Sequence, residues 1–467
     1  MKSSPLTRAI RLATLAAVAA PASVFAGGFS LNEQSASAMG VANAGAAANP
    51  ENATTVYFNP AGMSQLKGTN ISFGAAVLDI EAKAKKGASA RNQLNMEVQN
   101  SSSGGDIADV AVLPNFYLTH EVSDSIDVGF GIHAPYGLAA DYDDDFVGRY
   151  FADKTELTAI SFTPSVSVNN GNGLSMGLGL NIMYAEGRLT KFQDNSLANA
   201  ALTGGTNPYL HEDGYADIKG DDIGVTFRVG FLYELSDRTQ FGLTAQTGTE
   251  LNLKGDAKIR NYLNPGKGVF APIDVTERVR VPLAIPESIT FGARHQLTDD
   301  VTILAGASYA KWGNFEELDI VSREVGGDIT GAPQEGAVLS HVTEKWKNTW
   351  QFNVGGIWQA SQKWAFKAGY AYDESPVDEY LTARIPSNDR HWLTLGTQWK
   401  DAQSGWTVDA AVGTLIFDGN AKVDEWNYDH NNPTEVAQLP NGADPSNYTG
   451  EYELSAWSAS LQVSKAF

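Results

Sequence analysis

The feature that most constrains this chain is the alternation of large apolar side chains with small or polar ones. In the segment 174–182, every second residue is Leu, Met or Ile, and the residues between them are Ser, Gly or Asn. Because a β-strand points successive side chains to opposite faces, such a segment has one apolar and one polar face. The same period of two recurs along most of the chain and predicts an all-β fold, as in 223–233, 350–358 and 364–372.

Two all-β architectures can bury an apolar face. In a sandwich, two apolar faces pack against each other. In a membrane barrel, the apolar face meets lipid and the polar face meets a water-filled lumen. The alternation alone is compatible with both.

The lengths of the connections favour the barrel. Long and short connections alternate through the whole series, as they do in outer-membrane barrels with short periplasmic turns and long external loops. The even number of strands brings both ends of the barrel sequence to the same side. We predict a fourteen-stranded antiparallel transmembrane β-barrel with strands at roughly 69–82, 111–122, 126–136, 155–168, 173–190, 215–235, 239–253, 275–296, 301–315, 344–359, 363–373, 389–400, 405–418 and 451–467.

The N-terminal segment indicates export. Lys2, Arg8 and Arg11 precede a short apolar stretch that ends in Val-Phe-Ala, which is typical of a signal peptide, 1–26, cleaved after Ala26. No later segment approaches the ~20 apolar residues that a spanning helix needs. The terminal residue, Phe467, closes an amphipathic segment typical of the last strand of outer-membrane proteins. We therefore expect a multi-pass protein of the outer membrane of a Gram-negative bacterium.

Composition excludes several classes of function. The formal net charge is −21, which disfavours nucleic-acid binding because phosphate contacts need a basic surface. The chain has no Cys, so it has neither disulfides nor thiolate chemistry. Its His residues form no H-E-x-x-H motif, and G-x-S-x-G is absent. We expect no enzyme activity, no cofactor and no metal site. The acidic run 141–145 is either a solvated loop or a cation-mediated contact with lipopolysaccharide.

The segment 27–68 does not alternate and is rich in Ala, Gly, Ser and Asn. A fourteen-stranded barrel, 69–467, would leave a hole in its centre. Small residues allow short helices to pack closely inside such a lumen, and Asn59-Pro60 suits a helix start. We therefore predict that 27–68 forms a plug, or hatch, of short helices inside the barrel.

Three motifs stand out in the mature chain: the hatch start G-F-S-L-N-E-x-S-x-S, the later N-P-A, and I-P-x-x-D-R-x-W-L. Together they resemble the FadL-type long-chain fatty acid and hydrophobic compound transporters of the outer membrane. Further similar segments span the mature chain. They lie at 28–37, 59–61, 134–139, 309–312, 373–377, 385–393 and 465–467.

This resemblance implies a monomeric barrel whose hatch gates passive uptake. In such transporters a hydrophobic substrate is captured outside and moves to an internal site. It then leaves sideways through the wall beside the third strand. The partners implied are a long-chain fatty acid or other hydrophobic small molecule, outer-membrane lipid and lipopolysaccharide. The hatch residues implied in gating are Phe29, Leu31, Asn32, Glu33, Asn59, Pro60 and Ala61.

The third predicted strand ends in a way that suits a lateral opening at Pro135, Tyr136 and Gly137. Proline cannot donate a hydrogen bond to the neighbouring strand, so Pro135 must break the pairing or bend the strand. The alternative is that Pro135 simply begins the next loop.

A fatty acid also needs a cation for its carboxylate. The resemblance places Lys191 and Lys347 at such positions, and Arg188 lies close by in sequence. Both lysines have the parity of the polar, lumen-facing side chains in their predicted strands. The alternative is that they are ordinary basic residues at the rim of the barrel.

The cargo stays open at this stage. An aromatic hydrocarbon or alkane channel of the same family fits the same motifs, and a general diffusion porin fits the barrel but gives no reason for a hatch. The loop 191–214 is shorter than in the family, although its Leu197, Leu202, Tyr209 and Leu210 could line an external capture groove.

Overall fold

The computed structural model describes residues 28–99, 102–427 and 444–467. The expected signal peptide and Gly27 lie outside these residues. Within them, no helix is long and apolar enough to cross a membrane.

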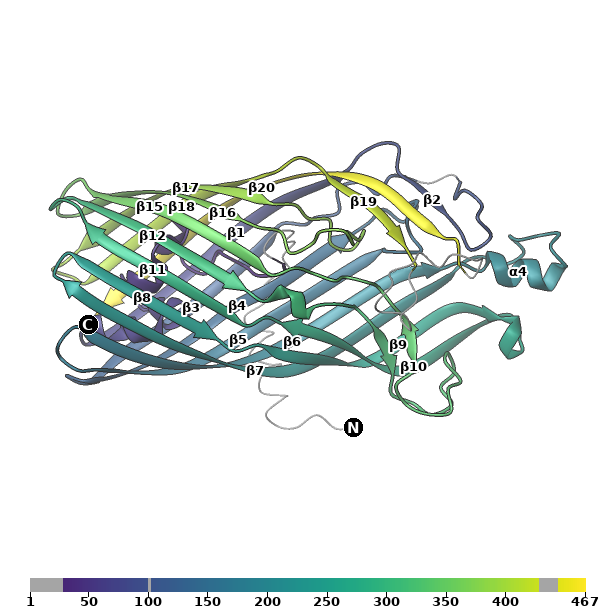
Figure 1. Cartoon of the computed structure of the whole chain (residues 1–467), viewed down its shortest axis with the longest axis horizontal. Helices are drawn as coiled ribbons and strands as arrows, with labels where there is room; N and C mark the ends of the chain where they lie inside the picture. The colour runs from purple at the N-terminus through teal and green to yellow at the C-terminus, as the bar shows by residue number, and fades with distance from the viewer. Residues whose placement is uncertain (1–27, 100–101, 428–443) are drawn as a thin grey trace.

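Fourteen antiparallel strands form a closed barrel, which confirms the predicted fold (Figure 1). Each strand pairs with the next, and the last pairs with the first to close the ring. In order around the ring, the strands are β1 (Thr69–Ala84), β3 (Ala111–Ser123), β4 (Ile126–Asp141), β5 (Lys154–Asn169), β6 (Leu174–Gln193), β7 (Gly214–Ser236), β8 (Thr239–Gln246), β11 (Ser288–Gln296), β12 (Val301–Ala310), β15 (Thr349–Gln359), β16 (Trp364–Asp373), β17 (Arg390–Asp401), β18 (Trp406–Phe417) and β20 (Asn447–Ala466).

Additional strands extend the wall at the long-loop end, which we call the outer end. Two of them continue β8 and β11 as one long hairpin, so the predicted loop 254–274 is mostly strand. At this end Figure 1 also shows the short helix α4. The added elements are β2 (Ser89–Arg91), α4 (Ser196–Thr203), β9 (Thr249–Asn264), η3 (Pro265–Lys267), β10 (Val269–Ile285), β13 (Ile320–Ser322), β14 (Val338–Ser340) and β19 (Ala421–Trp426).

Several predicted strand ends are wrong at the outer end. The predicted strand 126–136 continues to Asp141, so Pro135 lies inside β4 and does not begin the next loop. The predicted strand 301–315 stops at Ala310 and is followed by the short helix η4 (Trp312–Asn314), whose Trp312 is buried. The predicted strand 344–359 starts only at Thr349, so Lys347 lies in the preceding loop. In the latter two places the chain turns into the lumen, where its aromatic residues pack together.

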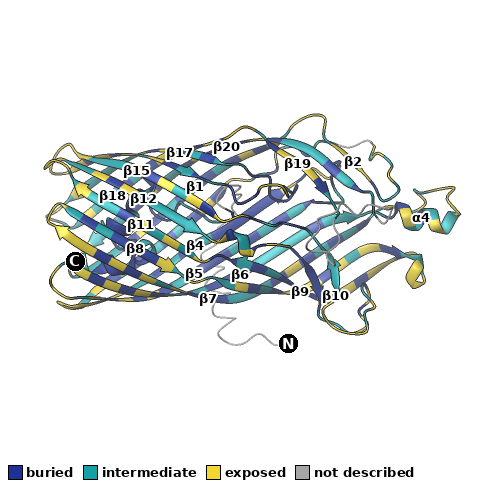
Figure 2. Cartoon of the chain, viewed as in Figure 1, coloured by how far each residue is buried: buried dark blue, intermediate teal, exposed yellow. Residues whose placement is uncertain are grey.

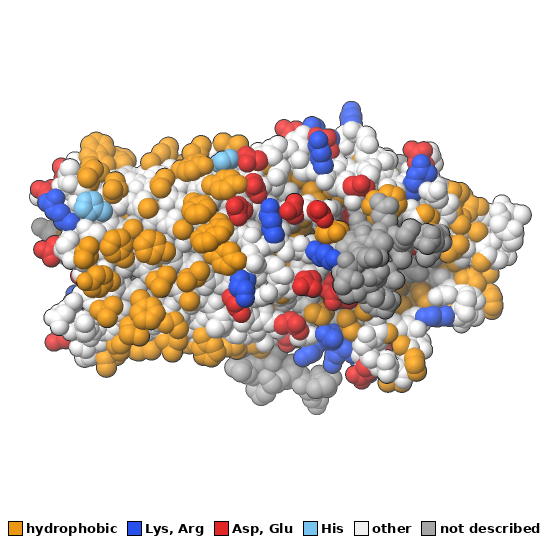
Figure 3. Space-filling view, in the orientation of Figure 1, with side chains coloured by type: hydrophobic (Ala, Val, Ile, Leu, Met, Phe, Trp, Pro, Cys, Tyr) orange, Lys and Arg blue, Asp and Glu red, His pale blue; other side chains and the backbone are white. Residues whose placement is uncertain are grey.

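The outer surface divides into two zones (Figure 3). Apolar side chains cover the half with the short turns, among them the exposed Leu178, Phe227 and Phe352. Charged side chains gather on the other half in this view. The first zone matches the lipid-facing band of an outer-membrane barrel.

The lining of the lumen shows the reverse arrangement, polar or small in the membrane half and largely apolar in the outer half. Figure 2 shows buried and exposed residues alternating along the strands. In the membrane half the inward positions are polar or small, such as Asn181 and Thr226. Beyond it, the inward positions of β9 and β10 become apolar, such as Leu253 and Val281, and outward ones are charged, such as Lys254. The outer half of the lumen is therefore lined largely by apolar side chains, with buried charged residues such as Glu277 among them, which the sequence analysis did not predict.

Short helices fill the inner half of the barrel. The wall accommodates them through glycines: a Cβ at Gly242 would overlap the carbonyl of Ala47, and one at Gly369 would overlap the backbone of Val41. β1 begins at Thr69, and the division into a 27–68 hatch and a 69–467 barrel unit stays a prediction. The helices are α2 (Ala36–Met39), η1 (Ala46–Ala48), α3 (Thr55–Phe58) and η2 (Pro60–Gln65).

Candidate functional site

We call residues 35–66 the plug and residues 28–34 the arm. Asn59 organises the plug, because its side chain accepts a hydrogen bond from Ala61 N at 3.0 Å and donates to Ala47 O at 2.6 Å. It also donates to Phe231 O of the wall at 3.0 Å. Pro60 starts η2 and has no N–H to satisfy there. Asn59, Pro60 and Ala61 therefore hold the plug together and against β7.

A buried charge cluster attaches the plug to the opposite wall. Lys367 of β16 lies 2.5 Å from Glu51 of the plug and 3.3 Å from Asp409 of β18. It also donates to Ser37 O at 3.1 Å. Removing a charge from such a cluster leaves its partners buried without compensation, which is strongly destabilising.

The arm lies along the inner side of β4. Leu31 N donates to Pro135 O at 3.0 Å, and Gly137 N donates to Phe29 O at 2.9 Å. Ser30 pairs with Tyr136 as an antiparallel bridge. The structure thus brings the predicted hatch residues Phe29 and Leu31 together with all three residues of the predicted lateral opening.

Beside the arm, β4 is no longer paired with β3. The pairing of β3 with β4 stops at Phe116 and Ile132, although β4 continues to Asp141. On the other side, the register with β5 shifts between His133 and Tyr136. Prolines stand on both sides of the unpaired stretch, Pro135 on β4 and Pro114 on β3, and neither can donate a ladder hydrogen bond. The sequence analysis did not single out Pro114.

Phe29 is the centre of a buried aromatic cluster. Its ring lies 4.6 Å from that of Trp312, 5.8 Å from Trp346 and 5.9 Å from Tyr136, measured between centroids. Phe29 is only 2% exposed. The same residue whose carbonyl binds the free edge of β4 therefore fills the lumen with its ring.

Phe29 also closes one end of an apolar cavity of about 50 Å³. Most of the lining is aliphatic or aromatic. The other lining residues are Thr155, Glu156, Gly187, Arg188, Gly220 and Arg384. Binding pockets for small molecules are usually ~300–1,000 Å³. A long acyl chain therefore does not fit unless Phe29 moves. The apolar side chains that line the cavity are Leu138, Leu157, Leu189, Ile218, Leu253, Val281, Leu283, Phe315, Leu318 and Ile385.

Arg384 is the cation buried at this cavity. It is 4% exposed and donates to Thr155 Oγ1 at 3.0 Å and to Thr190 O at 3.1 Å. No carboxylate in the described ranges lies within 4.0 Å of its guanidinium. Sequence reasoning missed Arg384, although it directly precedes the I-P-x-x-D-R motif and that position was the available signal.

Hydrogen bonds to the preceding peptide fix the position of Arg384. Ala383 N donates to Glu425 at 2.7 Å, and Ala383 O accepts from the Tyr142 hydroxyl at 2.5 Å. The Tyr142 hydroxyl is also hydrogen-bonded to that of Tyr452 at 2.7 Å. Wall and loop thus hold the guanidinium in place before any ligand arrives.

The three predicted basic residues lie apart from one another. Lys191 points into the lumen and donates to Ser340 Oγ at 3.0 Å. Arg188 has the outward parity on β6 and forms a two-point ion pair with Asp217, at 2.9 Å for each contact. Lys347 is 45% exposed and lies 3.9 Å from Asp378. Their role in binding a carboxylate stays a prediction.

A larger groove, of about 350 Å³, opens above the apolar cavity at the outer end. Lys191 lies at its edge, and Ile218 lines both spaces. Its other apolar residues include Ile259, Ile320 and Leu339. The predicted groove residues 197, 202, 209 and 210 are not among its lining, because the chain around α4 extends away from the barrel (Figure 1).

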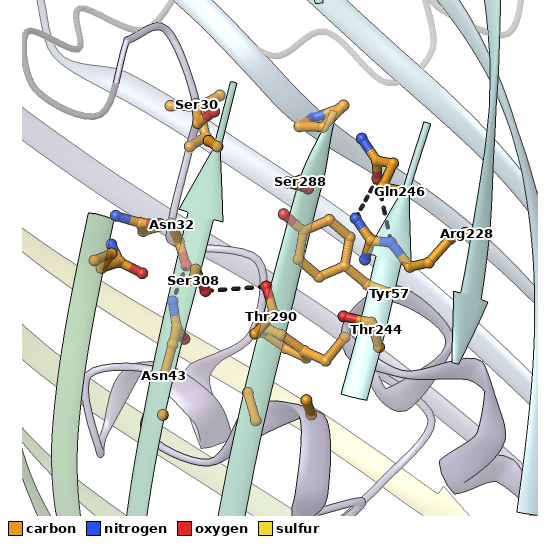
Figure 4. Close-up of a pocket in the computed structure, with 18 of the residues that line it drawn as sticks. Ser30, Asn32, Asn43, Tyr57, Arg228, Thr244, Gln246, Ser288, Thr290 and Ser308 are labelled. Carbon is orange, nitrogen blue, oxygen red and sulfur yellow. Dashed lines mark hydrogen bonds between the residues drawn. The ribbon is translucent and has the colours of Figure 1, made fainter. Parts of the chain in front are cut away.

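Below the arm, a chamber of about 190 Å³ with a mixed polar and apolar lining separates it from the plug (Figure 4). Arg228 lies over the ring of Tyr57 at 4.7 Å and donates to Gln246. Asn32 lines this chamber, and its carbonyl accepts from Asn43 at 3.0 Å. The chamber therefore offers hydrogen-bonding groups beside apolar side chains such as Phe58 and Met183.

Glu33 is buried where the arm joins the plug. Burial raises its pKa above the ordinary value, and the charge of Arg390 opposes this shift. Arg390 forms an ion pair with Asp373 at 2.7 Å at the outer ends of β17 and β16. The Arg390 of the D-R-x-W motif thus faces the start of the hatch.

Comparison with known proteins shows which family has this architecture. The family model described as "Outer membrane protein transport protein (OMPP1/FadL/TodX)" matches residues 16–467. The long-chain fatty acid transport protein of Escherichia coli O6:H1 is 26% identical over 459 residues, which cover 94% of each chain. The 47 kDa outer membrane protein of Pasteurella multocida is 29% identical and covers 85% of this chain and 89% of its own.

Solved structures show the same fold. A Pseudomonas aeruginosa FadL homologue superimposes with a TM-score of 0.81, at 21% identity, over 94% of this chain and all of its own. The Pseudomonas putida toluene transporter TodX superimposes with a TM-score of 0.65, at 17% identity, over 94% of this chain and 99% of its own. The chain is thus an outer-membrane protein that belongs to the OMPP1/FadL/TodX family of transport proteins.

Proposed function

We propose that this protein acts as a monomer that carries long-chain fatty acids, or closely similar amphiphiles, passively across the outer membrane. The observation that carries the proposal is an apolar cavity that ends on a single buried guanidinium, Arg384, and on the ring of Phe29. An apolar space binds the chain, and a buried cation binds the carboxylate.

Capture takes place in the outer groove. Its volume of about 350 Å³ falls within the usual range for a small-molecule site, and its lining is largely apolar. Lys191 at its edge attracts the carboxylate, while the acyl chain gains free energy from leaving water, about 0.8 kcal/mol for each buried CH₂. Ile218 lines both spaces, so the groove adjoins the cavity below.

The cargo then moves down into the apolar cavity, where its carboxylate pairs with Arg384. A guanidinium binds a carboxylate through two parallel hydrogen bonds, and a low-dielectric site strengthens them. Lys347 is screened by water and Arg188 is paired on the outer face, so their contributions are smaller.

Filling the cavity displaces Phe29, and this opens the wall. The ring and the carbonyl belong to one residue, so moving the ring breaks the hydrogen bond from Gly137 N to Phe29 O. The paired contact from Leu31 N to Pro135 O weakens with it. The unpaired edge of β4 then faces lipid, and the cargo leaves sideways between β3 and β4. The exit suits hydrophobic cargo, because the hydrocarbon core accepts it directly.

A channel for aromatic hydrocarbons or alkanes is the second candidate. The relative named as a toluene transporter supports it, and an uncharged cargo would use the same cavity and the same wall opening. The buried charge of Arg384 favours the fatty acid. A general diffusion porin fits less well, because the plug fills the inner half of the lumen.

Binding by single-site variants tests the cargo class. Arg384→Met should weaken oleate binding by about tenfold or more, since a charge-assisted hydrogen bond contributes about 1.5–3 kcal/mol. Oleyl alcohol, which has the same chain but no charge, should bind almost as before. Lys191→Met should have a smaller effect on oleate, and Lys347→Met a smaller one still. Affinities are measured by fluorescence titration in detergent.

Arg278→Met is the matched control, because this exposed arginine of β10 has its own carboxylate partner, Glu324, and lines neither the cavity nor the groove. An equal loss for oleate and oleyl alcohol in Arg384→Met would remove the carboxylate role. Tight toluene binding with no measurable oleate binding would support the hydrocarbon channel instead.

A further inference from the structure

A small β-ribbon at the outer end carries Glu317, Asp319 and Thr343, which the transport route does not use, beside His341, which also lines the outer groove. β13 and β14 pair with each other, and β13 also pairs with β10 of the wall. Below them the ribbon continues through Leu318 and Val342, which exchange backbone hydrogen bonds at 2.9 and 3.2 Å. Its residues Ile320 and Leu339 line the outer groove, so the ribbon forms part of the groove wall.

One face of this ribbon gathers four oxygen and nitrogen donors. Alternate residues of a strand share a face, so Glu317 and Asp319 lie together, and so do His341 and Thr343 on the partner strand. His341 Nδ1 lies 2.6 Å from Asp319 Oδ1, and its Nε2 lies 2.9 Å from Thr343 Oγ1. A bridge between Glu317 and Thr343 fixes the register.

The carboxylates of Glu317 and Asp319 and a ring nitrogen of His341 lie within 4.8 Å of one another. In the described part of the chain this is the only group of three such side chains close enough to share an ion. Asp319 is 6% exposed and His341 is partly buried, so two of the donors are already held in place. Glu317 is exposed, and one of its carboxylate oxygens lies within the same 4.8 Å.

We infer that Glu317, Asp319 and His341 bind a divalent transition-metal ion of the Zn²⁺ class. Zinc takes imidazole nitrogen and carboxylate oxygen at ~2.0–2.2 Å and commonly uses three protein ligands plus water. Imidazole suits Zn²⁺, whereas Ca²⁺ and Mg²⁺ prefer all-oxygen sites. Two carboxylates balance the charge of the ion. The Thr343 hydroxyl orients the imidazole through the ring nitrogen that does not bind the metal.

Such an ion would cross-link the two strands of the ribbon, because its coordination bonds come from residues on both. The ribbon carries the apolar lining residues Ile320 and Leu339 on the same segment as the ligands. Metal binding would therefore stiffen one wall of the outer groove. This inference concerns the ribbon alone and does not depend on which cargo the barrel carries.

Zinc titration of the full chain in detergent tests the site after treatment with EDTA. We expect one Zn²⁺ bound per chain, and a weakening of about tenfold or more in His341→Gln and in Asp319→Asn, because each removes a direct ligand. Glu317→Gln changes an exposed side chain and keeps the fold intact, so it should lower the affinity without altering the barrel's heat-modifiable mobility on gels.

His391 supplies the matched control. It also lies between a carboxylate, Asp418 at 3.0 Å, and a hydroxyl, Tyr370 at 2.7 Å, but no second carboxylate joins them. His391→Gln should leave zinc affinity unchanged. Binding that survives both His341→Gln and Glu317→Gln, or no binding at all, would overturn the inference and leave His341 and Asp319 as a hydrogen-bonded pair only.

Discussion

At the scale of single residues, the site depends on charges that are removed from water. Glu344 is one of them, in the loop before β15. It is 1% exposed and accepts a hydrogen bond from Trp346 Nε1 at 2.8 Å. Burial raises the pKa of Glu344 to about 8, against the opposing charge of Arg384. Because Trp346 packs on Phe29, the protonation of Glu344 bears on the aromatic cluster that closes the cavity.

The pH dependence of this loop follows from that shift. The folded state binds the Glu344 proton more tightly than the unfolded state, whose pKa is near 4.5. The contribution of the Glu344 proton to the stability of the folded loop is therefore fully present below about pH 4.5. It is lost as the pH rises through about 8. Hydrogen exchange of the 341–348 amides, corrected for intrinsic rates, should show less protection at pH 9 than at pH 6.

Glu344→Gln should remove this dependence, since the amide stays neutral at both pH values. Glu335→Gln, at an exposed position in the preceding loop, serves as the control and should keep it. The same loss of protection in Glu344→Gln as in the unmodified protein would show that another group causes it.

The sequence could predict the type of these residues but not their burial. Lys191 was found through its parity and does point into the lumen. The same parity argument predicted that Lys347 faces the lumen, but Lys347 lies in a loop because the strand begins two residues later. Arg384 lies in a loop without periodicity, so no pattern in the sequence distinguishes it from exposed arginines. Only the folded loop brings it against β5 and β6.

At the scale of elements, the plug and the arm are attached to the wall in different ways. Buried charges and side-chain amides hold the plug, through Lys367 and Asn59. The arm is held by hydrogen bonds and by the ring of Phe29. The hydrogen bonds are the two backbone contacts of Phe29 and Leu31 with β4, the one from Gln34 Nε2 to Ala134 O at 2.7 Å, and those that Gln34 O and Asn32 O accept from Tyr117 and Asn43. Breaking the second set costs less, so we expect the arm to move while the plug stays in place.

Lys367→Met tests the attachment of the plug. It leaves Glu51 and Asp409 buried without their cation, which should destabilise the plug by about 3–5 kcal/mol. Ion conductance in planar bilayers should rise, because a loosened plug admits water and ions. Lys363→Met, which breaks only an exposed pair with Asp401, should leave conductance unchanged. Unchanged conductance in Lys367→Met would mean that other contacts suffice.

The predicted elements are most accurate in the membrane half. There, outward apolar residues alternate with small or polar ones, as in β6 and β15, and the strand pattern is clear. Beyond the membrane the pattern changes phase: β9 turns Ala257 inward and Lys258 outward. The rule that apolar residues of a membrane barrel face outward therefore fails for the part of β9 and β10 that lies beyond the membrane. The reversal also marks the apolar part of the lumen, which the same rule predicted to be polar.

At the scale of the whole molecule, the barrel joins two environments in series. Its outer lumen is largely apolar down to the aromatic ring of Phe29, and its inner lumen has a mixed lining and is plugged. The unpaired edge of β4 lies where the two zones meet. The closed ring and its loop order follow from the sequence, whereas this junction depends on contacts between segments about 100 residues apart.

The central claim is that cargo moves the arm and leaves through the wall beside it. A reversible disulfide between Ser30→Cys and Tyr136→Cys tests it, because these residues are antiparallel partners and the chain has no other Cys. A second pair, Ala411→Cys with Ser460→Cys, cross-links β18 to β20 away from the arm and is the control.

The decisive measurement is oleate uptake into cells or vesicles that carry each pair, oxidised and then reduced. The account predicts that oxidation of the 30–136 pair abolishes uptake, that a reductant restores it, and that the 411–460 pair transports in both states. Uptake at the full rate through a completely cross-linked 30–136 pair would contradict the account, because the arm would then have no need to leave the wall.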